Sequence, residues 1–122
     1  MDIIFLLGKI IFGGYFIYNA YGHFANLDAL TGYAQSKKVP MPKIAVIVTG
    51  IMLLIGGVSI ISGQYVFIGL WLLIIFLVVT SILMHPFWKL ADDMQLKMSE
   101  KINFTKNMAL VGALLMLAAI VR

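Results

Sequence analysis

Two histidines are the side chains of this sequence with the widest chemical range. His23 and His85 each end a long apolar run, and Asn19 lies one helical turn before His23. Imidazole exchanges protons near neutral pH, binds metal ions and forms hydrogen bonds through two distinct nitrogens. Polar and aromatic side chains are also common at membrane boundaries as anchors. The residues alone leave open whether these histidines bind a ligand or anchor a helix end.

A second polar group opens the last apolar run. Asn103, Lys106 and Asn107 are three and four residues apart and therefore share one helix face. Amide, imidazole and ammonium groups can hydrogen-bond the oxygens of a ligand. The predicted ligand site comprises Asn19, His23, His85, Asn103, Lys106 and Asn107. If His85 is instead structural, its predicted partner is Asn103 or Asn107.

Other site chemistries find less support in the sequence. The two histidines, even with Asp92 and Asp93, match no spacing of a zinc or iron site, so no metal ligand is predicted. The sequence has no cysteine, which excludes thiol chemistry and iron–sulfur ligation by the chain itself. It has no glycine-rich phosphate loop, nucleophile elbow or paired carboxylates, so no catalytic residue is predicted.

The composition is that of a membrane protein. Of 122 residues, 62% are hydrophobic and 11% are charged, whereas soluble domains carry about 25% charged residues. The mean hydropathy is +1.03. The net charge of +4 does not indicate nucleic acid binding, because the basic residues flank apolar runs, as they do at a membrane surface. A single transmembrane domain over residues 1–122 is predicted.

Four segments are apolar over about the 20 residues that cross a bilayer. They are 3–24, 44–62, 65–84 and 104–121. The predicted fold class is therefore all-α, a polytopic membrane bundle of four transmembrane helices. Small residues should let helices pack closely in lipid, namely Gly13, Gly14, Gly50, Gly56, Gly57, Ala109, Gly112 and Ala113. The bulky third helix, with Gly69 alone, is predicted to face lipid or a partner more than the others do.

Two longer connections are predicted to form short interfacial segments on one side of the bundle. The first opens at Asn26, a possible N-cap, and ends before Pro42, which suits the first turn of a helix. In the second, apolar and charged positions fall on opposite sides, as in an amphipathic helix lying in the interface plane. The apolar positions are Phe87, Leu90, Ala91, Met94 and Met98, and the charged positions are Lys89, Asp92, Asp93 and Glu100.

Lysines predict the orientation of the bundle. Seven of them lie in or beside the two long connections, whereas the other side has Arg122, the amino terminus and possibly Lys9. Positive residues favour the cytoplasmic side, so the long connections should be cytoplasmic and both termini outside. Both histidines and the Asn103 group fall on this lysine-rich side. The topology therefore gathers the predicted site at one membrane boundary.

Five stretches, in order over nearly the whole chain, resemble the DoxX family of small four-helix membrane proteins. They are "GKIIFGGYFIYNAYGHF", "YAQSKKVPMP", "VTGIMLLIGGVSIISG", "HPFW" and "FTKNMALVGALL". The family is named for a small membrane subunit of archaeal quinol oxidase and thiosulfate–quinone oxidoreductase assemblies. Bacterial members are linked to membrane oxidoreductase complexes. The resemblance implies a prokaryotic cell membrane and a quinone-linked role, and it supplies no agreed catalytic residues.

Residues and resemblance together predict a small integral membrane subunit of a quinone-linked oxidoreductase complex, with a quinone or lipid headgroup at its loop-rich face. The expected partners are the bilayer and other membrane subunits or a second copy. The alternative is a membrane anchor or scaffold without a small-molecule site. A transporter is less favoured, because no charged residue is predicted at the bundle midplane. A ring-sized pocket lined by Asn19, His23 and His85 would favour the quinone site, and a cluster packed shut by Phe87 and Trp88 would favour the scaffold.

Overall fold

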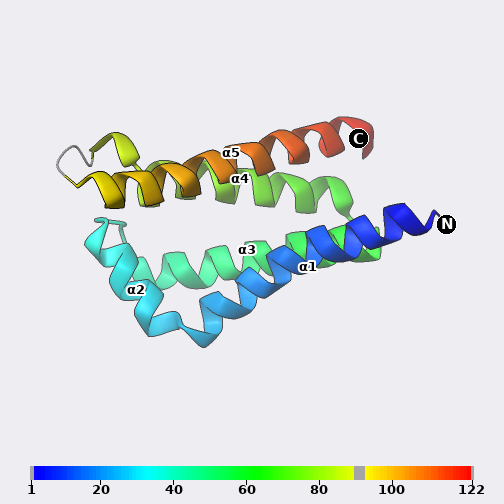
Figure 1. Cartoon of the computed structure of the whole chain (residues 1–122). Helices are drawn as coiled ribbons and strands as arrows, with labels where there is room; N and C mark the ends of the chain where they lie inside the picture. The colour runs from blue at the N-terminus through cyan, green and yellow to red at the C-terminus, as the bar shows by residue number, and fades with distance from the viewer. Residues whose placement is uncertain (1, 90–92, 122) are drawn as a thin grey trace.

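The computed structural model describes residues 2–89 and 93–121 (Figure 1). Its elements are α1 (Ile3–Ala25), α2 (Leu27–Ser36), α3 (Pro42–Ser62), α4 (Val66–Met84), the short 3-10 helix η1 (Phe87–Lys89) and α5 (Met94–Val121). Helices α1, α3, α4 and α5 are each long and apolar enough to cross a membrane. The described residues contain no strand. The all-helical class and the four spans are confirmed, and a fifth α-helix arises because the first long connection folds into α2.

The helices pack in an order that leaves one side of the bundle less tightly closed. Helix α1 lies against α3, α3 against α4, and α4 against α5, while α2 packs on α3. The closely packed pairs do not include α1 with α5. Figure 1 shows both termini at one end of the bundle and α2 at the other end, beside the start of α5. The two ends therefore differ: one carries the termini and the α3–α4 turn, and the other carries the long connections.

Helix α4 contributes most to the core. Leu70, Leu73 and Ser81 are fully buried, and Ile74 and Leu77 are nearly so. The prediction that this helix faces lipid more than the others is wrong, because α4 packs against both α3 and α5. Its bulky side chains fit because the neighbouring helix is small at the contact: a Cβ added to Gly56 would collide with the Leu73 side chain.

Glycine also sets the approach of α1 to α3. A Cβ on Gly13 would lie 2.6 Å from Ile61 Cγ1 and 2.8 Å from the Gly57 carbonyl oxygen. A Cβ on Gly57 would lie 2.7 Å from the Gly13 carbonyl oxygen. Only hydrogen fits between these backbones, as in close helix pairs in lipid. The predicted close packing is confirmed at Gly13, Gly50, Gly56 and Gly57 and is wrong at Gly14 and Gly112, where a Cβ would meet nothing within 4 Å.

Helix α5 begins ten residues earlier than the predicted last span. Its 28 residues measure about 42 Å, more than the roughly 30 Å of a hydrocarbon core. Asp93 starts the helix, since its Oδ1 accepts a hydrogen bond from the Leu96 backbone N–H at 3.0 Å. Residues from Met94 onward are thus continuous with the last span and do not form a separate amphipathic helix. Leu90, Ala91, Asp92 and Arg122 lie outside the described residues.

The position of Glu100 shows that the predicted division of the second long connection into an apolar and a charged side is wrong at this residue. The sequence pattern places Glu100 on the water-facing side, but the residue is 5% exposed. The physical reason is the continuity of α5: once the helix runs unbroken through residue 100, Glu100 lies three residues before Asn103 and seven before Asn107, on the face that turns toward the bundle.

Candidate functional site

A cavity of about 330 Å³ lies at the end of the bundle that carries α2. Its walls come from all five α-helices and from His85, which follows α4. Five of the six predicted site residues line it, and Asn103 does not. The polar and titratable lining consists of Tyr15, Asn19, His23, Tyr33, Thr49, Thr80, His85, Lys106 and Asn107. The rest is apolar and includes Phe16, Leu53, Phe76 and Leu77.

His23 is fixed by hydrogen bonds to α3. Its Nδ1 lies 3.0 Å from the Val46 carbonyl oxygen and 3.2 Å from Thr49 Oγ1. Thr49 donates its own hydroxyl proton to the Ala45 carbonyl oxygen at 2.7 Å. A carbonyl oxygen accepts and never donates, so the geometry assigns the ring proton to Nδ1. In the neutral ring, Nε2 is then a hydrogen-bond acceptor.

His85 is joined to a buried carboxylate. Its Nδ1 lies 2.8 Å from Glu100 Oε2, and the two side chains are 16% and 6% exposed. Tyr33 donates its hydroxyl to the other oxygen, Glu100 Oε1, at 3.3 Å. The chain Tyr33–Glu100–His85 thereby connects α2, α5 and the end of α4. A buried carboxylate needs such donors, because an unpaired charge in an apolar interior is costly.

The phenol of Tyr33 remains protonated in this arrangement. Burial first, and then the charge of Glu100 and the hydrogen bond to it, raise the pKa of Tyr33 above its ordinary value. All three effects disfavour a second negative charge beside the carboxylate. Tyr33 therefore stays a donor to Glu100 at neutral pH.

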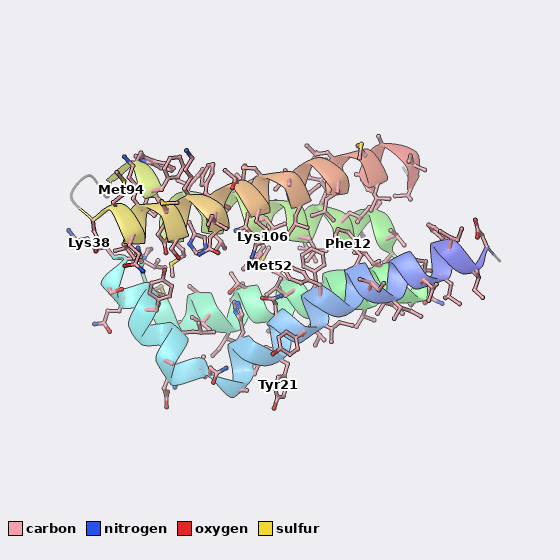
Figure 2. The ribbon with its side chains drawn as sticks, viewed as in Figure 1. Phe12, Tyr21, Lys38, Met52, Met94 and Lys106 are labelled. Carbon is pink, nitrogen blue, oxygen red and sulfur yellow. The ribbon has the colours of Figure 1, made fainter. Side chains whose placement is uncertain are left out.

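Three further polar side chains complete the lining. The Asn19 amide donates to the Tyr15 carbonyl oxygen of its own helix at 2.8 Å. Lys106 Nζ lies 5.8 Å from the centre of the Tyr15 ring and so links α5 to α1 across the side where these helices are not closely packed. Figure 2 shows Lys106 reaching from α5 toward the α1–α3 pair. Asn107 is 6% exposed, and none of the side-chain hydrogen bonds among the described residues involves it.

The aromatic pair after His85 does not close the cavity. Phe87 and Trp88 pack edge-to-face on each other and on Phe104 near the start of α5, with ring centres 5.4 to 5.5 Å apart. Neither lines the cavity. Asn19, His23 and His85 line one cavity, and among the described residues Phe87 and Trp88 do not pack it shut.

Sequence reasoning missed Glu100 and Tyr33, and it assigned His85 the wrong candidate partners, Asn103 and Asn107. A signal for Glu100 was present: it shares the helical spacing of Asn103 and Asn107. Tyr33 had no comparable signal, because it is 67 residues from its partner and belongs to another helix.

The cavity combines an apolar and aromatic wall with several convergent polar groups, which is the usual make-up of a small-molecule site. Its volume is at the lower end of the range of about 300–1,000 Å³ for such sites. This suits one ring-sized headgroup better than a whole lipid. Among residues 2–89 and 93–121, no group of three or more His, Cys, Asp or Glu side chains could hold a metal ion.

A family model described as DoxX matches residues 4–86, which include α1 to α4 together with Asn19, His23 and His85. Glu100, Lys106 and Asn107 lie beyond the matched range. No curated protein and no solved structure matches the chain.

Proposed function

This chain belongs to the DoxX family, and we propose that it is a small membrane subunit of a quinone-linked oxidoreductase complex that binds a quinone or lipid headgroup in its cavity. The observation that carries the proposal is the cavity itself. The end of α1, the residue that follows α4 and the interior of α5, which are distant in sequence, supply imidazole, amide and ammonium groups to one apolar pocket. These groups hydrogen-bond ring oxygens, and the aromatic wall formed by Phe16 and Phe76 suits the ring.

The apolar tail of such a ligand has a route out of the pocket. Val79 and Leu83, one turn apart on α4, both line the cavity and are 48% and 44% exposed on the bundle surface. A surface of this kind faces lipid in a membrane protein, because the chain around it is apolar. The headgroup would therefore lie among the polar side chains while the isoprenoid tail lies between the bundle and lipid.

A second candidate, the scaffold without a small-molecule site, is favoured by the Tyr33–Glu100–His85 chain. These three side chains join three elements of the fold, and each of them has a hydrogen-bond partner within the protein without a ligand. A substitution of Asn107 can distinguish the two candidate functions, because Asn107 is buried in the cavity lining and takes no part in the Tyr33–Glu100–His85 chain.

We expect Asn107→Leu to weaken headgroup binding without destabilising the protein. It removes one hydrogen bond to the ligand, worth about 0.5–1.5 kcal/mol, or roughly two- to twelve-fold in affinity. The melting temperature should stay the same or rise, since the ligand-free protein loses no internal hydrogen bond and gains apolar packing. The measurement is titration of the detergent-solubilised chain with a decyl-tailed benzoquinone, with mass spectrometry of quinone co-purified from native membranes.

Asn103→Leu is the matched control for this change. Asn103 is on the same helix one turn away and does not line the cavity. The Asn103→Leu variant should therefore bind the quinone with the affinity of the parent. If the parent retains no quinone and Asn107→Leu and Asn103→Leu give the same affinity in the titration, the result would contradict the headgroup site and support the scaffold function.

The proposal includes an orientation: the end of the bundle with α2 faces the cytoplasm of a prokaryotic cell. Figure 2 shows Lys38 and Met94 at that end, and Lys97 follows Met94 by one turn of α5. Because the sequence contains no cysteine, Lys38→Cys and Lys97→Cys each create a unique thiol. A membrane-impermeant maleimide should label both only after the cells are permeabilised.

Gln64→Cys, in the exposed turn between α3 and α4, is the control for the opposite side. It should be labelled in intact cells. The reverse pattern, with Lys38→Cys and Lys97→Cys labelled in intact cells, would invert the orientation and leave the fold unchanged.

A further inference from the structure

We propose that the cavity takes the reduced, dihydroxy form of its headgroup, a hydroquinone, and that His85, positioned by Glu100, accepts one of its hydroxyl protons. This inference rests on the proposed function and adds the redox state that the site prefers. An oxidised quinone offers only carbonyl acceptors, whereas a hydroquinone offers hydroxyl donors. The preference therefore follows from whether the histidines present acceptors or donors to the cavity.

Both histidines form hydrogen bonds to other protein groups through Nδ1. His23 Nδ1 donates to the Val46 carbonyl oxygen at 3.0 Å. His85 Nδ1 lies 2.8 Å from Glu100 Oε2. The hydrogen bond at one ring nitrogen sets the tautomer, so each neutral ring keeps its proton on Nδ1 and has a lone pair on Nε2. Since both side chains line the cavity, Nε2 is the ring atom that remains for a ligand.

Of the two histidines, only His85 has a carboxylate at its Nδ1. Glu100 is buried and receives the Tyr33 hydroxyl on one oxygen and the His85 ring on the other. A buried carboxylate hydrogen-bonded to Nδ1–H holds the ring orientation and stabilises the imidazolium that forms when Nε2 takes a proton. The Nδ1 of His23 instead contacts the Val46 carbonyl oxygen and the Thr49 hydroxyl, neither of which carries a charge that would stabilise an imidazolium.

The proton transfer balances without an oxidant. The hydroxyl O–H bond of the headgroup breaks, an Nε2–H bond forms on His85, and the electron pair stays on the headgroup oxygen. The imidazolium is then paired with the Glu100 carboxylate. The headgroup anion is left in a cavity lined by the ammonium group of Lys106. The titratable and charged groups that line the cavity or contact His85 are Tyr15, His23, Tyr33, Glu100 and Lys106. Lys106 provides positive charge for the anion, and Glu100 provides negative charge for the imidazolium.

Glu100 is a positioning residue in this scheme, because it acts through His85. Lys106 only donates, and it does so equally well to a carbonyl and to a hydroxyl oxygen, whereas the Asn107 amide can donate or accept. The contribution of the His85–Glu100 pair is therefore the change that a Glu100 substitution causes in the ratio of the hydroquinone and quinone affinities. General destabilisation of the fold cancels in that ratio, which separates a positioning role from a structural one.

The test begins with the ligand-free protein. Nitrogen-15 spectra of the full chain, labelled at its two histidines, should show Nδ1 protonated and Nε2 unprotonated in both rings at neutral pH. The second measurement is anaerobic titration with a decyl-tailed hydroquinone and with the matching benzoquinone. We expect the parent to bind the hydroquinone more tightly by about two- to twelve-fold, the range of one net hydrogen bond.

Two variants of the same hydrogen-bonded chain locate the source of the preference. Tyr33 and His85 contact different oxygens of Glu100. Glu100→Gln removes the charge and puts an amide NH2, which cannot accept, in place of one of these oxygens, so the affinity ratio should fall. Tyr33→Phe keeps the charge and the His85 contact, so the ratio should be retained even if the melting temperature falls. Equal binding of both redox forms by the parent, or Nε2-protonated rings, would overturn the inference and leave the proposed function standing. Failure of both forms to bind would remove the proposed function as well.

Discussion

Gly13→Leu should separate α1 from α3 and remove most of the folded protein. A single added carbon would already lie 2.6 Å from Ile61 Cγ1 and 2.8 Å from the Gly57 carbonyl oxygen, so the backbones must move apart. Overpacking a well-packed core typically costs about 1–3 kcal/mol, and the contact here is partly with backbone, which cannot rotate away. The measurement is thermal unfolding and the monodisperse yield from size-exclusion chromatography in one detergent.

Gly14→Leu is the neighbouring control. A Cβ at Gly14 meets nothing within 4 Å, and glycine inside a helix is less stable than alanine by roughly 0.5–1 kcal/mol. This variant should melt at or slightly above the temperature of the parent. Equal melting temperatures for Gly13→Leu and Gly14→Leu would show that the close approach of α1 and α3 does not hold the bundle together.

This packing also determines the geometry of the site. His23 is on α1, and its hydrogen-bond partners Val46 and Thr49 are on α3, four residues and one residue before the glycine contact at Gly50. A Cβ on Gly50 would lie 3.0 Å from His23 Cβ. The glycines of α3 therefore allow His23 to reach the carbonyl oxygen that fixes its tautomer.

Ala34→Phe should abolish headgroup binding while the protein still folds. Ala34 is 4% exposed on α2 and lines the cavity, so a phenyl group there occupies the space of the ligand ring. Filling an apolar cavity is usually neutral or stabilising, which distinguishes this change from one that damages the core. The measurement is the quinone titration described above, together with the melting temperature.

Ala29→Phe is the control on the same helix. Ala29 is exposed and does not line the cavity, so the same substitution should leave the affinity unchanged. A folded Ala34→Phe protein that binds the headgroup as tightly as the parent would place the ligand elsewhere on the molecule.

The sequence was sufficient to predict the four spans, and to predict that five of the polar side chains lining the cavity lie close together, for one physical reason. Runs of apolar residues set the helices, and polar residues at helix ends are then forced to one boundary by the alternating topology. Asn19, His23 and His85 came together on this basis. Lys106 and Asn107 joined them through their spacing on one helix face.

Other features depend on packing that periodicity does not reveal. The central position of α4 follows from the match between Gly56 and Leu73, which are on different helices. Glu100 was assigned to water because the start of α5 was placed too late, and a shift in a helix boundary changes which face a charged residue is thought to occupy. The contact of Tyr33 with Glu100 joins residues 67 positions apart, for which a single sequence has no pattern.

The central claim is that the headgroup binds inside this cavity. Its most direct test is photo-crosslinking of the full chain in lipid nanodiscs with a decyl-tailed azidobenzoquinone, followed by peptide mapping. The account predicts labels on cavity residues of separate helices, such as His23, Thr80 and Asn107, which disappear with excess unmodified hydroquinone and in Ala34→Phe. Labels that resist competition and fall on outward-facing positions such as Ile11 and Met116, which are 73% and 66% exposed, would contradict it.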